Sequence, residues 1–175
     1  MTNLPNGTTF PTLEFAVVGG GTVQLPRDVI GDWVAILIYR GSWCPFCIAQ
    51  LTSFNRAADK LKTAGIRVVA LSADDEKTAT RTVDEHGISV PVAHSADPSR
   101  LEQVLGSYIG DDEDGRYAQS TGFLLRPDGT VAVAVYSSEA IGRLTASDVL
   151  GYVAHVREEE GSEGHTGPSE QAEAS

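Results

Sequence analysis

Cysteine is scarce in this chain: its 175 residues include only two, and these are three positions apart. A secreted domain stapled by disulfides would place several cysteines in loops far apart in the sequence. The N-terminal stretch also lacks the basic run and the long apolar segment that a signal peptide or a membrane span needs. We therefore expect a cytoplasmic protein in which the two cysteines carry chemistry.

Positive charge is also scarce, with 13 Lys and Arg against 24 Asp and Glu and a formal net charge of -11. A field of this sign repels nucleic acids and anionic membranes, so neither is expected as a partner. Part of the acidic excess follows Arg157, where Glu, Gly and Ser predominate. We expect one domain over residues 1–157 and a disordered acidic tail over 158–175.

Hydrophobic patterning predicts alternating strands and helices. The run 33–39 is continuously apolar and rich in branched residues, which is typical of a strand buried on both faces. Apolar positions three and four apart then predict a helix over 47–62. The acidic segment 106–119 is expected to be an irregular surface loop. The other expected strands are 12–18, 22–25, 66–71, 90–93, 123–125 and 130–136, and the other expected helices are 76–86, one that begins after Asp97, and 146–156.

This order of elements predicts an α/β fold, with a central mixed β-sheet, helices on both faces and a β-hairpin at the N-terminus. Right-handed crossovers put the loop after strand 33–39 at the carboxyl edge of the sheet. The sites of α/β proteins usually lie at that edge. The two cysteines come directly after this strand, so they fall where a site is expected.

Cys44 and Cys47 are predicted to lie at the start of a helix, on one face and close enough to form a disulfide. The unpaired N–H groups and the positive dipole end of a helix N-terminus favour the thiolate, the reactive form of cysteine. Pro45 suits the first position of a helix, because it has no N–H to leave unpaired. Arg40 is expected to add positive potential.

We expect Cys44 to be the attacking sulfur, because it lies at the junction of loop and helix, whereas Cys47 lies one turn inside. Cys47 then resolves the mixed disulfide or sulfenic acid, leaving a Cys44–Cys47 disulfide for a cellular reductant. Trp43 is expected either to shield the sulfurs or to pack against the loop. Ser42 is expected to cap the helix in preference to binding a thiolate.

The stretch 39–51, with Trp-Cys-Pro-Phe-Cys at its centre, resembles the active site of peroxiredoxin-like proteins in the alkyl hydroperoxide reductase/thiol-specific antioxidant family. Supporting motifs follow in the same order as in the family: Gly87-Ile88 before 90–93, Asp97-Pro98 before a helix, and a Pro-Asp-Gly hairpin within 122–131. The resemblance extends over residues 12–156 and implies a thioredoxin-like fold. It also implies a thiol-dependent peroxidase, reduced by a thioredoxin-like protein or a low-molecular-weight thiol, with a homodimer as an option.

The chain departs from the family pattern Pro-x-x-x-Thr/Ser-x-x-Cys in two places. In that frame Cys47 takes the peroxidatic position, Cys44 replaces the threonine, and Arg40 replaces the proline. The resemblance therefore keeps Cys47 as an alternative nucleophile to Cys44.

Two further family positions are filled differently. The second-site arginine is expected just before the late strand, where this chain has 119–121, so Arg116 or Arg143 is predicted to substitute for it. The motif also resembles the Trp-Cys-x-x-Cys site of thioredoxin-like reductases, which place a cis-proline before the same strand. In this chain Thr121 is expected to occupy that place.

No second pair of ligands at a metal-binding spacing accompanies the cysteines, so we expect neither a metal nor a cofactor. Three functions stay open at this point. The first is a peroxidase that reduces hydrogen peroxide or an organic hydroperoxide with a thiol donor. The second is a dithiol-disulfide reductase, and the third is a redox-sensing binding module without turnover.

Overall fold

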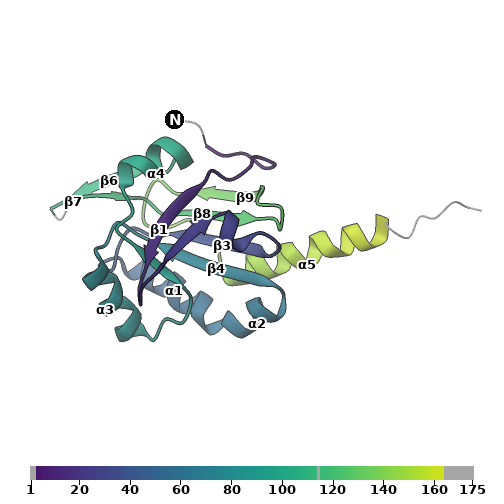
Figure 1. The fold of residues 1–175 in the computed structure, drawn as a ribbon, viewed down its shortest axis with the longest axis horizontal. Coiled ribbons are helices and arrows are strands. Elements are labelled where there is room, and N and C mark those ends of the chain that lie inside the picture. Colours follow the sequence, from purple (N-terminus) through teal and green to yellow (C-terminus); the bar gives the residue numbers. More distant parts are fainter. Residues whose placement is uncertain (1–2, 114, 164–175) are drawn as a thin grey trace, which may run out of the picture.

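The computed structural model describes residues 3–113 and 115–163 (Figure 1). The strands are β1 (Leu13–Val17), β2 (Thr22–Leu25), β3 (Trp33–Ile38), β4 (Ile66–Leu71), β5 (Val92–His94), β6 (Ile109–Asp112), β7 (Gly115–Ala118), β8 (Thr121–Leu125) and β9 (Val131–Tyr136). The helices are the short 3-10 helix η1 (Arg27–Val29), α1 (Pro45–Arg56), α2 (Ala58–Thr63), α3 (Glu76–His86), α4 (Pro98–Leu105) and α5 (Ala146–Glu163). Seven strands form one sheet in the order β2-β1-β5-β4-β3-β8-β9, and β6 pairs with β7 in a sheet of their own.

Strand β3 runs through the centre of the molecule, and all six of its residues are buried. It pairs in parallel with β4 and antiparallel with β8, which makes the sheet mixed, as predicted. Its side chains alternate between two cores, so that Ile36 packs in one and Leu37 in the other. The predictions of a strand buried on both faces and of an N-terminal hairpin, β1 with β2, are both confirmed.

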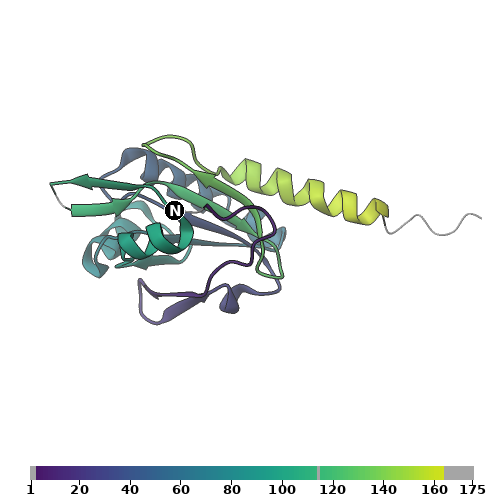
Figure 2. The ribbon, with the colours of Figure 1, turned by 90° about the horizontal axis from the view of Figure 1, so that it is seen from above.

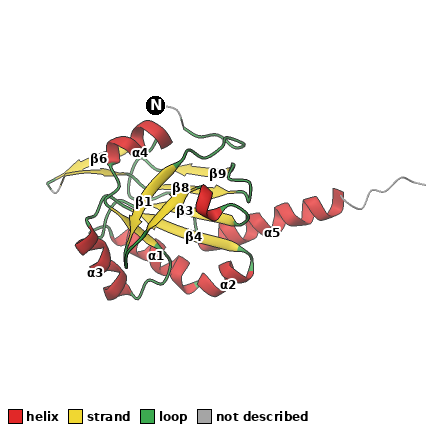
Figure 3. Ribbon diagram, in the orientation of Figure 1, coloured by secondary structure: helices red, strands yellow, loops and turns green. Residues whose placement is uncertain are grey.

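Helices cover both faces of the sheet, as predicted, but unequally (Figures 2 and 3). Four helices pack on the face that contains Leu37, whereas α4 and Val29 of the short η1 pack on the opposite face, together with residues of the N-terminal segment. Their core side chains are Leu51 and Phe54 of α1, Leu61 of α2, Ala79 of α3, Val149 and Val153 of α5, and Leu101 and Leu105 of α4. The site loop between β3 and α1 is thus anchored at both ends by buried elements.

The single helix predicted over 47–62 is two helices. The chain turns at Ala57, whose backbone N–H donates to the carbonyls of Ser53 and Phe54 at 3.2 and 3.1 Å. Sharing one N–H between two carbonyls is common where a helix ends, and α2 then begins in a new direction. The apolar spacing continues across the break, which is why it does not show in the sequence pattern.

The acidic segment 106–119 contains a β-hairpin, so the prediction of an irregular loop is wrong. Gly106 ends α4 in the left-handed conformation, with φ of 75°. The chain then pairs with itself, Ile109 opposite Ala118 and Asp111 opposite Arg116. Most residues of these strands are at least partly exposed, so no apolar alternation marks them. The hairpin projects from the body of the protein (Figures 1 and 2).

Helix α5 is longer than the sequence predicts. The apolar spacing predicts an end at Val156 and a disordered tail from 158, but residues 158–163 continue the helix. His155 Nε2 lies 3.3 Å from Glu159 Oε1, one turn later, and glutamate favours helix. The helix extends well beyond the sheet (Figure 1). The rest of the predicted tail lies outside the described residues, and among the described helices none is both long and apolar enough to cross a membrane.

Candidate active site

The two cysteines lie where the chain turns from β3 into α1. Cys44 is the N-cap of α1, and its Sγ accepts the backbone N–H of Cys47 at 3.4 Å. Pro45 takes the first helical position, as predicted. Because a cysteine caps this helix, the prediction that Ser42 does so is wrong. Ser42 instead donates its backbone N–H to Asp74 Oδ2 at 2.9 Å, which ties the loop to the end of β4.

Neither cysteine is open to solvent: only 1% of Cys44 and 0% of Cys47 is exposed. The prediction that Cys44 is the exposed member of the pair is therefore wrong. Both side chains belong to the core that contains Leu51 and Phe54. Arg143 lies against the two sulfurs from loop 137–145. Exposure therefore does not decide which sulfur attacks.

The Cys47 sulfur accepts hydrogen bonds from two groups that stabilise an anion. The backbone N–H of Arg40 and Nη2 of Arg143 each donate to it at 3.3 Å. Burial, followed by the neighbouring Cys44, nonetheless raises the pKa of Cys47 to about 11, although Arg143 and the Arg40 N–H oppose this shift. Cys47 is therefore a thiol at neutral pH.

One side chain, Arg143, joins the two sulfurs. Its Nη2 lies 3.7 Å from Cys44 Sγ and 3.3 Å from Cys47 Sγ. The carbonyl of Ala140 accepts from Nε at 3.1 Å and from Nη2 at 2.8 Å, so the loop holds its own guanidinium in place. Of the two arginines predicted to substitute for the family's second-site arginine, the structure brings this one to the cysteines.

Two residues that the sequence analysis missed fix the other side of this guanidinium. Nη1 of Arg143 donates to Gln50 Oε1 and to Ser120 Oγ, each at 3.0 Å. Gln50 also donates from Nε2 to the carbonyl of Leu144 at 3.0 Å, so it holds both the arginine and its loop. The available signal was the spacing, since Gln50 follows Cys47 by one helical turn and lies on the same face of α1.

The Arg40 side chain turns away from the sulfurs. Its guanidinium carbon lies 4.8 Å from the centre of the Trp43 ring and 5.3 Å from that of Tyr117, and Nη2 donates to Tyr117 Oη at 3.1 Å. The Trp43 ring meets the Tyr117 ring edge to face, with centroids 5.0 Å apart. Trp43 is thus packed against the β6–β7 hairpin, and Arg40 reaches Cys47 through its backbone alone.

The two remaining predicted residues are Thr121 and Arg116. Thr121 is buried at the start of β8, opposite Ile38, and its hydroxyl donates to the carbonyl of Gln119 at 3.1 Å. Among the contacts of the described residues, none joins Thr121 to a sulfur. Arg116 is held on the hairpin and α4, 3.4 Å from Glu102 Oε2 and 3.6 Å from Asp111 Oδ1.

The site therefore combines two thiols with one guanidinium. Two thiols can give up two electrons and two protons to form a disulfide. A guanidinium stabilises a thiolate and also an oxygen on which negative charge develops. Within residues 3–113 and 115–163, no group of three or more His, Cys, Asp or Glu side chains is placed to hold a metal ion. The described groups are those of thiol redox chemistry.

Known proteins with similar sequences are redox proteins. The sequence model of the AhpC/TSA family matches residues 6–134. The thiol-disulfide oxidoreductase ResA of Bacillus thuringiensis (strain Al Hakam) is 27% identical over 148 residues, which cover 84% of this chain and 76% of that protein. A putative peroxiredoxin of Mycobacterium tuberculosis (strain CDC 1551 / Oshkosh) is 27% identical over 147 residues, which cover 82% of this chain and 92% of that protein.

Solved peroxiredoxin structures share the fold. Mycobacterium bovis AhpC gives a TM-score of 0.75 at 16% identity, covering 98% of this chain and 100% of that chain. The peroxidoxin BcpB of M. tuberculosis gives a TM-score of 0.74 at 16% identity, covering 89% of this chain and 99% of that chain. These likenesses confirm the predicted thioredoxin-like α/β fold, and the two kinds of named relative are thiol-dependent oxidoreductases. Because the family match extends over most of the chain and includes both cysteines, this protein belongs to the AhpC/TSA family.

Proposed function

We propose that this protein reduces peroxides with the Cys44–Cys47 pair and is itself reduced by a thiol. The observation that carries the proposal is the Arg143 guanidinium, whose Nη2 lies within 3.7 Å of both sulfurs. A cation in this place stabilises a thiolate before the reaction and the charge on the leaving oxygen during it. The relative named as a putative peroxiredoxin supports this substrate class.

In the proposed reaction a thiolate attacks one peroxide oxygen and the O–O bond breaks. The other oxygen leaves as water or an alcohol after taking up a proton, and the sulfur becomes a sulfenic acid. The second thiol attacks this sulfur, water leaves, and the Cys44–Cys47 disulfide forms. Two electrons thus pass from the cysteines to the peroxide, and two thiol equivalents later restore them.

Cys44 is the proposed nucleophile because of its place at the start of α1, since its exposed fraction does not support this role. Its Sγ caps the N-terminus of α1 and accepts the N–H of Cys47, so the positive end of the helix dipole lies beside the sulfur on which charge develops during attack. Cys47, with its pKa raised to about 11, retains its proton and acts as the resolving thiol. The family frame favours the opposite assignment, and the two donors on the Cys47 sulfur agree with it. The single cysteine variants decide between them.

Substrate access is part of the proposal, because both cysteines are buried. The side chain that lies against them, Arg143, is only partly buried and belongs to loop 137–145, which contains no helix or strand. Moving a side chain and an irregular loop disturbs fewer packed contacts than opening the core. A peroxide is therefore proposed to enter as this loop shifts.

Peroxide consumption by reduced protein tests the proposal. Hydrogen peroxide or cumene hydroperoxide is added to wild type, Cys44→Ser, Cys47→Ser and the double variant, and the remaining peroxide is measured over time. Wild type is expected to consume one equivalent rapidly and to turn over when dithiothreitol is present. The Cys47→Ser variant should consume one equivalent and stop at a sulfenic acid, and Cys44→Ser should lack the rapid phase. The reverse pattern assigns attack to Cys47.

The double variant is the control for reactions that do not need cysteine. If wild type consumes neither peroxide faster than this control, the peroxidase proposal is wrong. Labelling of Cys47→Ser but not of Cys44→Ser by a reagent that reacts with sulfenic acids and not with thiols, after peroxide addition, identifies Cys44 as the attacking sulfur independently of the rates.

A dithiol-disulfide reductase is the second candidate, and one feature of the site favours it. An apolar pocket of about 280 Å³ lies beside the cysteines, between α1 and loop 137–145, with Phe46 and Ile141 exposed at 50% and 67%. Such a surface suits a protein substrate better than a peroxide. Reduction of insulin disulfides without peroxide turnover supports this candidate, whereas peroxide turnover without disulfide reduction excludes it.

The source of electrons and the location belong to the proposal too. The reductant is proposed to be a thioredoxin-like protein or a low-molecular-weight thiol, and the compartment the cytoplasm, where thiol reductants keep cysteines reduced. Cell fractionation with an antibody to the protein checks the compartment. Size-exclusion chromatography of reduced and oxidised protein checks for a homodimer.

A further inference from the structure

A second pocket lies beside the cysteines, on the side away from Arg143. It has a volume of about 490 Å³, within the range of small-molecule sites, and lies beyond the carboxyl ends of β3 and β4. Its walls come from three parts of the chain: Arg40 and Trp43 from the site loop, Asp74 and Arg81 from the β4–α3 segment, and Tyr117 from the hairpin. Nothing in the peroxide reaction uses this pocket.

Two arginines of the pocket, Arg40 and Arg81, form no close ion pair with a carboxylate of the described residues. Within the described part of the chain, no acidic oxygen lies within 4.0 Å of the guanidinium nitrogens of Arg40 or Arg81. Arg40 is held in place by the rings of Trp43 and Tyr117. Its cation is therefore fixed before a ligand arrives, which lowers the entropy that binding would cost.

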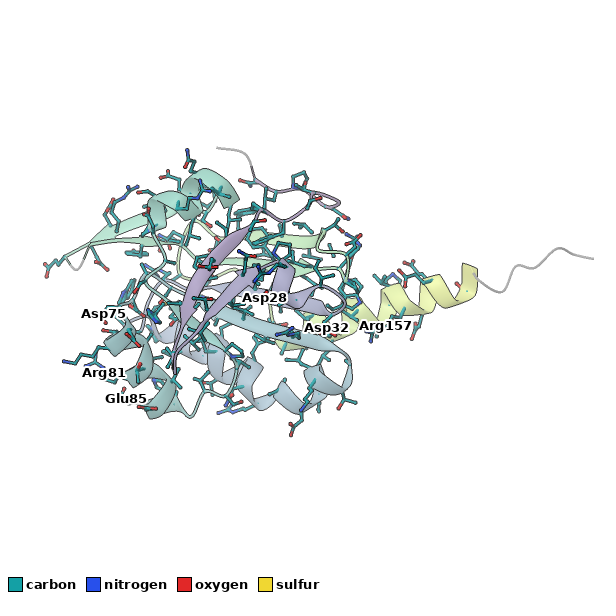
Figure 4. All side chains as sticks on the ribbon, in the orientation of Figure 1. Asp28, Asp32, Asp75, Arg81, Glu85 and Arg157 are labelled. Carbon is teal, nitrogen blue, oxygen red and sulfur yellow. The ribbon has the colours of Figure 1, made fainter. Side chains whose placement is uncertain are left out.

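Two carboxylates of the pocket, Asp74 and Asp75, accept hydrogen bonds from backbone N–H groups. Asp74 accepts the backbone N–H of Ser42 at 2.9 Å, and Asp75 accepts that of Thr78 at 2.8 Å as the cap of α3. Neither contact cancels the negative charge. Asp75 and Arg81, labelled in Figure 4, lie at the start and in the middle of α3. Asp74 and Asp75 interact with the Arg81 charge at longer range, but no ion pair within 4.0 Å joins either of them to Arg40 or Arg81. These four side chains therefore present both signs of charge to a ligand that carries both.

The pocket is coupled to the cysteines by the chain itself. Arg40 lines the pocket with its side chain and donates its backbone N–H to Cys47 Sγ at 3.3 Å. Trp43 also lines the pocket and directly precedes Cys44, the cap of α1. A ligand bound here therefore contacts the loop that carries the two cysteines, although neither sulfur itself lines the pocket.

We propose that this pocket binds a small thiol of amino-acid type, with a carboxylate on Arg40 and Arg81 and an ammonium facing Asp74, and that this thiol reduces the Cys44–Cys47 disulfide. The reduction rests on the proposed function, which forms the disulfide. The ligand thiolate attacks one cysteine sulfur, the S–S bond breaks, and the released sulfur takes up a proton. A second thiol attacks the mixed disulfide, so two thiols leave as one disulfide and both cysteines are reduced.

The test uses protein oxidised with diamide, so that peroxide plays no part. Reduction by glutathione, and separately by 2-mercaptoethanol, is followed in a stopped-flow instrument through tryptophan emission. The rate is expected to saturate with glutathione, which carries carboxylates and an ammonium, and to rise linearly with 2-mercaptoethanol, which carries neither. Arg81→Gln is expected to lower the glutathione rate at low concentration at least tenfold, with less than a twofold change for 2-mercaptoethanol.

The matched control is Arg67→Gln, which removes the same charge from the second residue of β4, near the other end of that strand. It should leave the preference for glutathione intact. A glutathione rate that stays linear, or an equal effect of Arg81→Gln and Arg67→Gln on both thiols, overturns the proposal.

A binding measurement separates this proposal from the peroxidase proposal. S-methylglutathione cannot react with a disulfide, and its binding to reduced protein is measured by isothermal titration calorimetry. Saturable binding that Arg81→Gln weakens at least tenfold supports the pocket, even if no peroxide is consumed. Absence of binding heat and of competition with glutathione overturns it, even if peroxide is consumed.

Discussion

At the scale of single residues, the proposed chemistry depends on one arginine whose three nitrogens are all engaged. Nη2 lies against the two sulfurs, Nη1 binds Gln50 and Ser120, and Nε binds the carbonyl of Ala140. A guanidinium fixed in this way needs no reorganisation when charge develops on sulfur or oxygen. The positive charge is therefore in position before the peroxide arrives.

Replacing Arg143 by glutamine is expected to slow the reaction of the cysteines with peroxide about tenfold or more, since one fixed donor to the reacting charge is lost. Stopped-flow measurement of the rapid phase checks this. Arg126→Gln is the matched control, because Arg126 binds a backbone carbonyl, that of Val131, at the other end of β8. An Arg143→Gln rate within twofold of wild type would show that the guanidinium has no part in the reaction.

The raised pKa of Cys47 has a consequence for stability. Burial raises this pKa from 9.0 to about 11, so the folded state binds the proton more tightly than the unfolded state. The stabilisation from this group is complete below about pH 9 and is lost as the pH rises towards 11. Between these values the free energy of unfolding of reduced wild type should fall by on the order of 2 kcal/mol more than that of Cys47→Ser. Urea unfolding at several pH values checks this, and parallel curves would contradict it.

The sequence identified some site residues and could not identify others, for a physical reason. Cys44, Cys47 and Pro45 follow from local rules about helix starts. The burial of the two cysteines does not, because it depends on the core around them and on Arg143, which lies 99 and 96 positions later in the chain. Gln50 and Ser120 act through Arg143, from which they are separated by 93 and 23 positions. Rules of sequence spacing cannot predict that two residues belong to one site when each is connected to it only by hydrogen bonds to a third, distant residue.

At the scale of secondary structure, the buried elements were predictable and the exposed ones were not. β3, β4 and α3 have apolar patterns or caps that a single sequence shows. The β6–β7 hairpin lacks such a pattern, because its strands pair mainly with each other at the surface. The extension of α5 lacks it too, because residues 158–163 do not pack on the sheet and are held by local helical contacts.

The exposed part of α5 offers a test of local helix stability. Gly151 lies inside this helix with no atom within 4 Å of where a Cβ would be placed. Gly151→Ala is therefore expected to raise the free energy of unfolding by about 0.5–1 kcal/mol, because alanine loses less backbone freedom on folding. Urea unfolding followed by circular dichroism measures the difference.

Gly87→Ala is the matched substitution for this test. Gly87 also has open space around a new Cβ, but it ends α3 with φ of +58°. The same change should therefore destabilise the protein, by about 1 kcal/mol. Equal changes in the free energy of unfolding at the two positions would show that the backbone conformation of the glycine does not determine the effect of the substitution.

At the scale of the whole molecule, the sheet and its two cores bring together segments that are far apart in the chain. β3 delivers the cysteines to the carboxyl edge of the sheet, and β9 leads into the loop that carries Arg143. The β6–β7 hairpin adds Tyr117, which completes the polar pocket beside Arg40. The same fold thus places the two cysteines against Arg143 and a charged pocket beside Arg40.

The intact mass of the reduced protein after one equivalent of hydrogen peroxide tests the central claim most directly. If Cys44 and Cys47 are one redox couple, the mass falls by two hydrogen atoms, both free thiols disappear, and dithiothreitol restores them. A mass that does not change, or a lasting gain of one oxygen with one thiol still free, would contradict the account.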